Sequence, residues 1–394
     1  METLGVYISV PFCRAKCSYC NFASGVFSQD RMARYVDRLC EDLRSARQRA
    51  GALRAELPAT VDTIYFGGGT PSLLPVEQLD RCFAAVRSEF SVDSDAEITM
   101  ECAPGQMPDA LLANFAAWGV NRVSLGVQSF IDAEAKAVGR LHTREQILAD
   151  IKRLRAIGAA NISVDLIAGL PRQTDASWRE SLDVLIDTDV PHASVYMLEV
   201  DEDSRLGLEV IAGGVRYHAH EVPPEDQSAD FYIAACERLE QQGIRQYEIS
   251  NFARAGYESH HNNKYWTRVP YLGVGLDAHS MLLTSHGEAV RLATTDAMDN
   301  FLVGASETET TIVHREQAFE EEWFLGLRML RGVALDEIAG KYGNRALESV
   351  KPILKEAIAD GLLERVDSRV RLTQRGRLLS NEVFERFLGE PISA

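Results

Sequence analysis

The sequence lacks long apolar runs, a secretory signal and an excess of basic residues. It contains no run of 18 apolar residues, which a membrane-spanning helix would need. Its 41 Lys and Arg against 58 Asp and Glu give a formal net charge of −17, which argues against a broad nucleic-acid surface. The opening METLGVYISVPFC has no basic region followed by an apolar core and a cleavage site. Because the seven cysteines are an odd number, we expect a cytoplasmic protein whose thiols bind metal or lie buried.

Short apolar runs alternate with helical segments along the first 250 residues. We expect strands at Val6–Val10, Thr63–Phe66, Glu97–Cys102, Arg122–Gly126, Asn161–Ile167, Ala193–Leu198 and Gln246–Ser250. Helices are expected between them, near 29–51, 76–90, 107–118, 144–157, 176–187 and 226–243. This alternation predicts an α/β fold with a parallel sheet that is closed or partly closed into a barrel, whose strand ends meet at one mouth.

The pattern changes after about residue 310. An amphipathic helix in EQAFEEEWFLGLRMLRGV precedes two shorter helices, two β-like runs about a turn at Asp367-Ser368 and a last helix, which resembles an α+β winged-helix domain. We therefore expect a barrel core at 1–250, a barrel-rim extension at 251–310 and a C-terminal domain at 311–394. Five arginines surround the hairpin: Arg365, Arg369, Arg371, Arg375 and Arg377. The acidic chain disfavours a nucleic-acid role for them, and a lid or a partner-docking domain is the preferred hypothesis.

Three cysteines, Cys13, Cys17 and Cys20, lie within eight residues in the pattern C-x3-C-x2-C, directly after the first expected strand. A structural zinc site usually has four ligands, whereas the other cysteines are scattered and the loop contains no His. Three thiolates on one loop suit three irons of a [4Fe–4S] cluster, whose fourth iron stays open to the amine and carboxylate of S-adenosylmethionine (SAM). Zinc and unligated thiols are the alternatives. The spacing and its place in the chain resemble the radical SAM superfamily, which makes a 5′-deoxyadenosyl radical from SAM.

Residues near the ends of later strands fit the same family. The resemblance implies a SAM site in a partial (β/α)6 TIM-like barrel, made by Tyr7, Tyr19, Gly67, Gly68, Gly69, Thr70, Glu101, Gln128, Arg140 and Asp165. In that family the glycines and Thr70 hold the methionine part, and Tyr19 contacts adenine. A buried acid such as Glu101 needs a cation or a donor beside it, and Arg140 suits a carboxylate. Each residue taken alone could instead be a core polar group whose hydrogen bonds are satisfied.

Motifs in the second half of the chain indicate one branch of the superfamily. QYEISNFARAG (246–256), HNNKYW (261–266) and YLGVGLDAHS (271–280) resemble the coproporphyrinogen dehydrogenase-like group, and 361–388 resembles its C-terminal domain. The dehydrogenase carries a fourth cysteine two positions past the third and a longer arm before the cluster, whereas this chain has Phe22 there and twelve residues before Cys13. The chain is therefore similar to the heme chaperone group often called HemW. The alternative is an oxygen-independent coproporphyrinogen III dehydrogenase, which oxidatively decarboxylates two propionates.

The segment HHNNKYW places two imidazoles beside aromatic rings in an expected loop. Neutral imidazole is a good axial ligand for heme iron, so we expect His261 to bind it, with His260 as the rival and Asn262, Tyr265 and Trp266 as further contacts. Ordinary hydrogen bonding within the loop is the alternative. The resemblance implies heme b as ligand, respiratory membrane proteins as heme acceptors, transient membrane association through them, and a homodimer as a state open to test. It leaves open whether SAM is cleaved.

Overall fold

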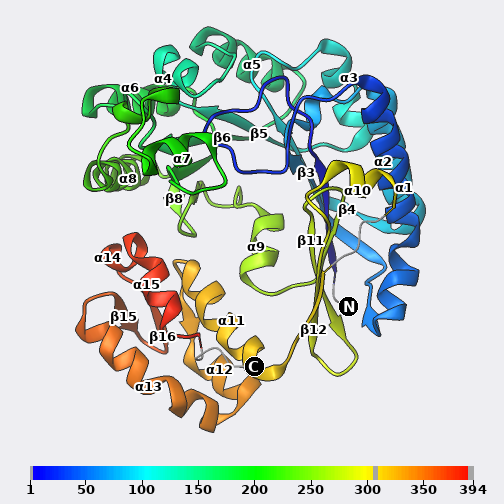
Figure 1. Cartoon of the computed structure of the whole chain (residues 1–394). Coiled ribbons are helices and arrows are strands. Elements are labelled where there is room, and N and C mark those ends of the chain that lie inside the picture. Colours follow the sequence, from blue (N-terminus) through cyan, green and yellow to red (C-terminus); the bar gives the residue numbers. More distant parts are fainter. Residues whose placement is uncertain (1–2, 305–308, 389–394) are drawn as a thin grey trace.

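Six parallel strands form the centre of the molecule (Figure 1). The computed structural model describes residues 3–304 and 309–388. The six strands are neighbours in chain order: β1 (Leu4–Val10), β3 (Thr60–Gly68), β4 (Ser91–Cys102), β5 (Arg122–Gln128), β6 (Asn161–Ala168) and β7 (His192–Met197). All five pairings are parallel. The predicted α/β fold with a partial (β/α)6 barrel is confirmed.

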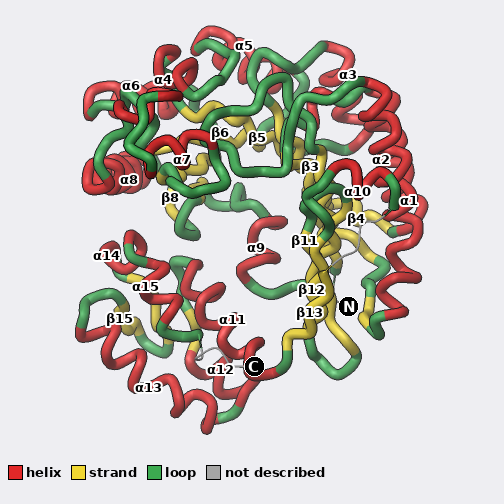
Figure 2. Tube along the Cα trace, viewed as in Figure 1, coloured by secondary structure: helices red, strands yellow, loops and turns green. Residues whose placement is uncertain are grey.

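Helices cover the outer face of this curved sheet (Figure 2). They are α1 (Gln29–Ala52), α2 (Val76–Glu89), α3 (Asp109–Trp118), α5 (Arg144–Ala156), α6 (Asp175–Asp187) and α8 (Glu225–Gln241). Shorter helices lie at the carboxyl ends of the strands: α4 (Asp132–Ala137), α7 (Arg205–Ile211) and the 3-10 helices η1 (Pro71–Leu73) and η2 (Arg216–Glu221). In α1, the Ser28 side chain caps the first turn by accepting a hydrogen bond from the Arg31 N–H. Buried Tyr35, Leu39 and Leu43 recur four residues apart, which gives α1 one apolar side.

The prediction of a seventh strand at 246–250 is wrong. Two short strands stand there instead, β8 (Arg245–Gln246) and β9 (Asn251–Ala253), and β9 runs antiparallel to β7. Between them the fully buried Glu248 carboxylate accepts hydrogen bonds from the Ser250 N–H at 3.0 Å and from the Asn251 side chain. These local bonds compete with a continuous strand.

The segment between 251 and 310 contains strands that the sequence analysis did not predict. β10 (Tyr271–Val274) lies parallel to β1 on the side opposite β3, with Gly5 opposite Tyr271. The sheet then continues antiparallel through β11 (His279–Thr284), β12 (Ala289–Ala293) and β13 (Glu309–Val313), and β2 (Ala55–Glu56) pairs with β11. Two short helices, α9 (His260–Trp266) and α10 (Met298–Leu302), complete the segment. The three domain boundaries themselves stay a prediction.

A second hydrophobic cluster forms the core of the C-terminal part, which lies across the open side of the barrel in Figure 1. Its elements are α11 (Arg315–Arg328), β14 (Val333–Ala334), α12 (Leu335–Tyr342), α13 (Asn344–Ala359), β15 (Leu363–Val366), β16 (Arg369–Leu372), α14 (Gln374–Leu378) and α15 (Ser380–Glu385). The predicted hairpin pairs β15 with β16 about Asp367, and the packed helices are centred on Trp323 and Leu354. Within the described ranges, no helix is both long and apolar enough to cross a membrane.

Candidate functional site

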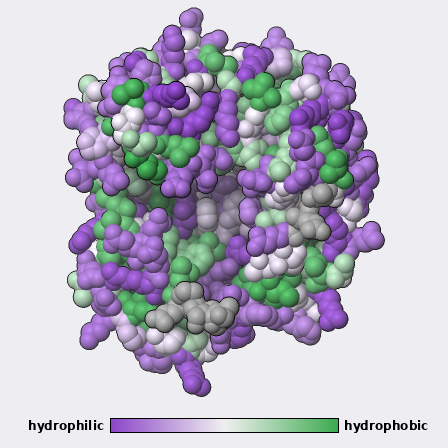
Figure 3. All heavy atoms as spheres, in the orientation of Figure 1, coloured by the Kyte–Doolittle hydropathy of each residue, from purple (hydrophilic) through white to green (hydrophobic). Residues whose placement is uncertain are grey.

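A cavity of about 820 Å³ lies at the carboxyl ends of the barrel strands. One wall is the cysteine loop (residues 11–28) between β1 and α1, and other walls are the ends of β3 to β7. The C-terminal part completes it with Arg328 and residues 377–382. Figure 3 shows a hollow between the barrel and the C-terminal part. The carboxyl ends of parallel barrel strands are where such folds place their chemistry, so this cavity is the candidate site.

The three clustered thiols all line this cavity and none forms a disulfide. Each sulfur has its own polar neighbour: Thr70 Oγ1 lies 3.8 Å from Cys13, Arg140 Nη1 3.7 Å from Cys17 and Ser24 Oγ 3.9 Å from Cys20. Among residues 3–304 and 309–388, no three His, Cys, Asp or Glu side chains gather closely enough to hold a single metal ion. Three separate thiols, each beside a hydrogen-bond donor, fit the donor set of a [4Fe–4S] cluster, whose potential such donors adjust.

The glycine turn after β3 is fastened to the cysteine loop by its backbone. The Gly69 N–H donates to the Val10 carbonyl at 2.9 Å, and the Thr70 N–H donates to the Phe12 carbonyl at 2.8 Å. A Cβ on Gly69 would lie 2.8 Å from the Val10 oxygen, so no larger residue fits there. Gly68 has a φ of +99°, which favours glycine. Gly68, Gly69 and Thr70 line the cavity as predicted for a ligand site.

Gly67 and Tyr7 belong to the layer just beneath the cavity lining. A Cβ on Gly67 would lie 2.8 Å from the Tyr65 ring and 3.0 Å from a Glu101 oxygen, so this glycine makes room for their contact. Tyr7 stacks on Tyr65 with ring centroids 6.0 Å apart, and burial raises the pKa of the Tyr7 hydroxyl. The roles predicted for these two residues as SAM contacts stay predictions, and what the structure shows is support for the residues above them.

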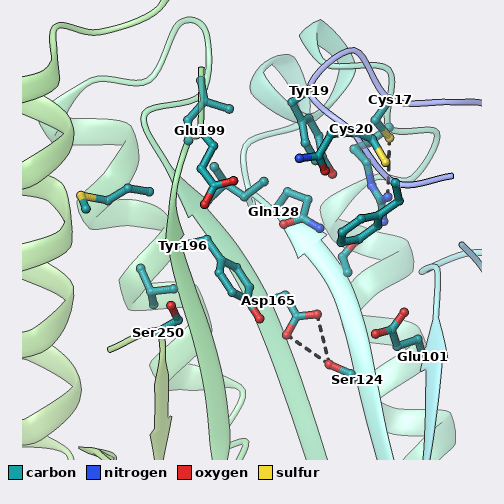
Figure 4. A pocket seen from close by; sticks show the side chains of 18 of the residues that line it. Cys17, Tyr19, Cys20, Glu101, Ser124, Gln128, Asp165, Tyr196, Glu199 and Ser250 are labelled. Carbon is teal, nitrogen blue, oxygen red and sulfur yellow. Dashed lines mark hydrogen bonds between the residues drawn. The ribbon is translucent and has the colours of Figure 1, made fainter. Parts of the chain in front are cut away.

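Two carboxyl groups face the cavity from neighbouring parts of the sheet (Figure 4). Glu101 accepts a hydrogen bond from the Tyr65 hydroxyl at 2.8 Å, and burial raises the Glu101 pKa to about 7. Asp165 accepts bonds from the Ser124 hydroxyl at 3.1 Å, and burial raises its pKa as well. A bound cation would favour the ionised form of both groups. The pair therefore suits a positively charged ligand or a ligand with hydroxyl groups.

Gln128, Arg140 and Tyr19 also line the cavity. Gln128 has a φ of +68°, uncommon for a residue with a side chain, and its buried Oε1 has no hydrogen-bond partner among the described residues. Arg140 bonds the Gly126 carbonyl and contacts the Cys17 sulfur, while its Nε has no partner. The Tyr19 ring packs on the apolar cluster around Val138. Strain and orphaned polar atoms at one place are typical of a site built to hold a ligand.

The predicted heme loop is a helix, α9, that fills the bottom of the barrel. Its first backbone N–H groups are bound by the buried Glu97 carboxylate, which accepts from His260 and His261 at 3.0 Å each. The His261 ring is buried, with Nδ1 2.8 Å from the Thr63 hydroxyl and Nε2 2.8 Å from the Tyr265 hydroxyl. Burial lowers the pKa of His261 to about 3, so the ring is neutral. We call α9 with Thr63 and Glu97 the barrel floor.

The remaining residues of the motif point toward neighbouring elements. The Tyr265 ring packs edge-on against Tyr271 of β10, with centroids 4.6 Å apart. The Trp266 ring lies under the Arg328 guanidinium, 4.2 Å from its carbon to the ring centroid. Asn262 donates its backbone N–H to the Ser259 hydroxyl that caps α9. His260 is exposed. The cavity lining contains none of the four predicted heme contacts His261, Asn262, Tyr265 and Trp266.

Several cavity residues were not predicted from the sequence. Ser124, Tyr196 and Ser250 lie on the barrel side of the cavity (Figure 4), and Arg328 and Arg377 on the side of the C-terminal part. Ser124 and Tyr196 lie on strands that were predicted, so their position in the chain was the signal, whereas Ser250 lies where the predicted strand does not form. The two arginines lie on α11 and α14 of the C-terminal part, and local sequence carried no sign that they line the same cavity as the barrel residues.

Comparisons with known proteins place the chain in a family. The radical SAM superfamily model matches residues 7–185, and the HemN C-terminal domain model matches 313–379. The heme chaperone HemW of Bacillus subtilis is 35% identical over 98% of this chain and 99% of that protein. The heme chaperone HemW of Escherichia coli is 31% identical over 99% of each chain. The solved structure of coproporphyrinogen III oxidase (HemN) from Escherichia coli has the same fold, with a TM-score of 0.82 at 22% identity over 98% of this chain and 90% of that one.

Proposed function

The chain belongs to the HemW family of radical SAM proteins, and from this premise we propose that it is a heme chaperone. In this proposal it binds heme b in the cytoplasm and delivers it to respiratory membrane proteins, associating with the membrane through them. Similarity to chaperones named HemW along 98% of the chain is the observation that carries the proposal. A [4Fe–4S] cluster and SAM are its proposed resident cofactors.

The cavity residues support this pair of cofactors. Cys13, Cys17 and Cys20 would hold three irons, since each thiol faces the cavity beside a donor. SAM would lie between the glycine turn and the strand ends, with its charged and polar groups near Glu101 and Asp165. A further hydrogen-bond donor of SAM would bond the Gln128 oxygen, which has no partner in the described part of the chain. When bound, the cluster and SAM supply radical chemistry. The chain's own residues position the ligands and cover them with the C-terminal part.

The test of the proposed function is an anaerobic heme titration of cluster-reconstituted protein, followed by difference absorbance. We expect saturable, stoichiometric binding by the wild type. Absence of saturation would refute the chaperone proposal. The same samples run on a sizing column with and without heme would report whether a homodimer forms.

The iron ligand is tested beside it with His261→Ala and His260→Ala. His261 would have to release both Thr63 and Tyr265 to reach iron, so we expect folded His261→Ala to bind heme with the wild-type spectrum. A changed spectrum in the folded variant would restore His261 as the ligand, and a change confined to His260→Ala would assign the exposed neighbour.

The alternative function, an oxygen-independent coproporphyrinogen III dehydrogenase, shares this fold. The chain has Phe22, 59% exposed, where the resemblance to that enzyme calls for a fourth cysteine. We expect no protoporphyrinogen from coproporphyrinogen III with SAM and a reductant under anaerobic conditions. Formation of this product over many turnovers would show that the protein is the dehydrogenase and would refute the chaperone proposal.

A further inference from the structure

One of the five hairpin arginines differs from the other four in its surroundings. Four have partners on the surface of the C-terminal part: Arg365 bonds the Asp367 carbonyl at 3.1 Å, Arg369 bonds Glu337 at 3.2 Å, Arg371 bonds Glu364 at 2.7 Å and Arg375 bonds the Asp360 carbonyl at 3.1 Å. Arg377 lines the cavity instead. Among the described residues its guanidinium has no hydrogen bond or ion pair, and its Nε is buried.

The neighbouring cation in the cavity is already neutralised. Arg328 Nε lies 2.8 Å from the buried Glu248 carboxylate, and Nη2 donates to the Ser250 hydroxyl at 3.1 Å. Trp266 stacks on its flat face. Arg328 therefore has a carboxylate, a hydroxyl and an aromatic ring around it. Arg377 instead interacts electrostatically with Tyr232 and Cys236, which are both uncharged at neutral pH because burial raises the pKa of both.

Arg377 shares the cavity lining with apolar side chains that we call the apolar wall: Tyr196, Met197 and Leu198 at the end of β7, Ile249 before β9, and Leu378 and Leu379 at the end of α14. The polar residues Ser380, Asn381 and Glu382 continue the lining after them. A half-buried, unpaired guanidinium is costly unless an anion meets it. The combination of an apolar wall and one free guanidinium suits a flat hydrophobic ligand that carries a carboxylate, because Arg binds carboxylates with two parallel hydrogen bonds.

We propose that Arg377 binds a propionate of a tetrapyrrole whose apolar ring lies between the end of β7 and α14. The proposal rests on the proposed heme function and gives it a location, on the side of the C-terminal part and away from α9. The backbone holds Arg377 in place, because Gly376 approaches the Leu362 carbonyl so closely that an added Cβ would lie 2.0 Å from its oxygen. The arginine is thus presented to the cavity from a tightly fixed turn.

The test uses Arg377→Gln in the full-length, cluster-reconstituted protein, with Arg375→Gln as the matched control on the same helix. Two ligands are titrated under anaerobic conditions: heme, and heme whose two propionates are methyl esters. Loss of a charge-assisted pair predicts heme binding about ten- to a hundredfold weaker in Arg377→Gln and unchanged in Arg375→Gln. The ester should bind the wild type and Arg377→Gln with the same reduced affinity.

Coproporphyrin III, which carries four propionates, separates the two proposals. If wild-type protein and Arg377→Gln bind heme equally, the propionate site is refuted and the chaperone proposal stands. If the wild type binds coproporphyrin III in an Arg377-dependent way but not heme, the site stands and the heme function falls. If it binds neither, both fall. If Arg377→Gln fails to fold, the two titrations of wild-type protein still test the site. A methyl ester that binds the wild type as tightly as heme would refute the propionate site.

Discussion

Buried polar side chains at the two ends of the barrel differ in how their hydrogen bonds are satisfied. At the mouth, the Gln128 oxygen and the Nε atoms of Arg140 and Arg377 are buried without partners. On the floor, both ring nitrogens of His261 and both oxygens of Glu97 are bonded. A buried polar group is stable when it is bonded and is available to a ligand when it is not. Hydrogen bonding therefore distinguishes these particular side chains, although among the described residues Asn263 Oδ1 and Trp266 Nε1 of α9 are also buried without a partner.

The sharpest test of the mouth is to remove one thiol. Cys17→Ala should abolish the cluster, because two thiolates from this loop would remain for a site that needs three, and bound iron and sulfide should fall to background. The apoprotein should stay folded with its urea midpoint lowered only slightly, because the substitution removes a single buried sulfur atom. Cys236→Ala, half-buried on α8, is the control and should keep its iron. Full iron content in Cys17→Ala would contradict the assignment.

Substitutions in the barrel floor should lower the free energy of unfolding. His261→Ala leaves the hydroxyls of Thr63 and Tyr265 without their partner and opens a cavity, which should lower the free energy of unfolding by about 3 kcal/mol. His260→Ala removes an exposed ring and should change it by less than about 0.5 kcal/mol. Urea unfolding of the two apoproteins measures both. Equal stability of the two variants would show that the floor is not held by His261.

Relieving the backbone strain at Gln128 should have two smaller effects in opposite directions: higher stability of the apoprotein and lower affinity for SAM. Gln128→Gly should stabilise the apoprotein by about 1 kcal/mol, because glycine adopts the φ of +68° without strain. It should also weaken SAM binding, because the unpaired amide is lost. Asp367→Gly relaxes a φ of +53° on the distant hairpin and is the control. It should gain stability and keep SAM affinity, as measured by urea unfolding and SAM titration. Unchanged SAM affinity in Gln128→Gly would remove Gln128 from the site.

The mildest expected effect is a pH dependence from Glu101. Its pKa in the folded protein is raised to about 7 by burial, so the stability that its proton contributes is fully present below the ordinary glutamate pKa and is lost as pH rises through about 7. Because SAM carries a positively charged sulfonium, it should bind better when Glu101 is ionised, so SAM affinity should increase severalfold between pH 6 and pH 8. Glu101→Gln should flatten both profiles. A wild-type affinity that does not change over this range would show that Glu101 does not interact with bound SAM.

The sequence predicted the features that are encoded locally. The six parallel strands follow from apolar runs, and the cysteine loop and glycine turn follow from spacing. The floor could not be predicted, because the partners of His261 are Thr63, far earlier in the chain, and Tyr265, whose approach depends on a helix that the motif alone did not reveal. Arg377 was one of five arginines that the sequence places around the hairpin. That it lines the cavity could not be predicted, because this depends on how the C-terminal part packs against the barrel.

The place of β10 has a consequence for the order of synthesis. β1 carries the cysteine loop and leaves the ribosome first, yet one of its two neighbouring strands, β10, pairs Tyr271 with Gly5 and is made late. Pairings between residues so far apart in sequence form slowly. We therefore expect the cysteine loop, during translation, to lie beside an unpaired edge of β1 and without cover from the C-terminal part. We expect cluster assembly to have easier access to the loop before the C-terminal part is made than after.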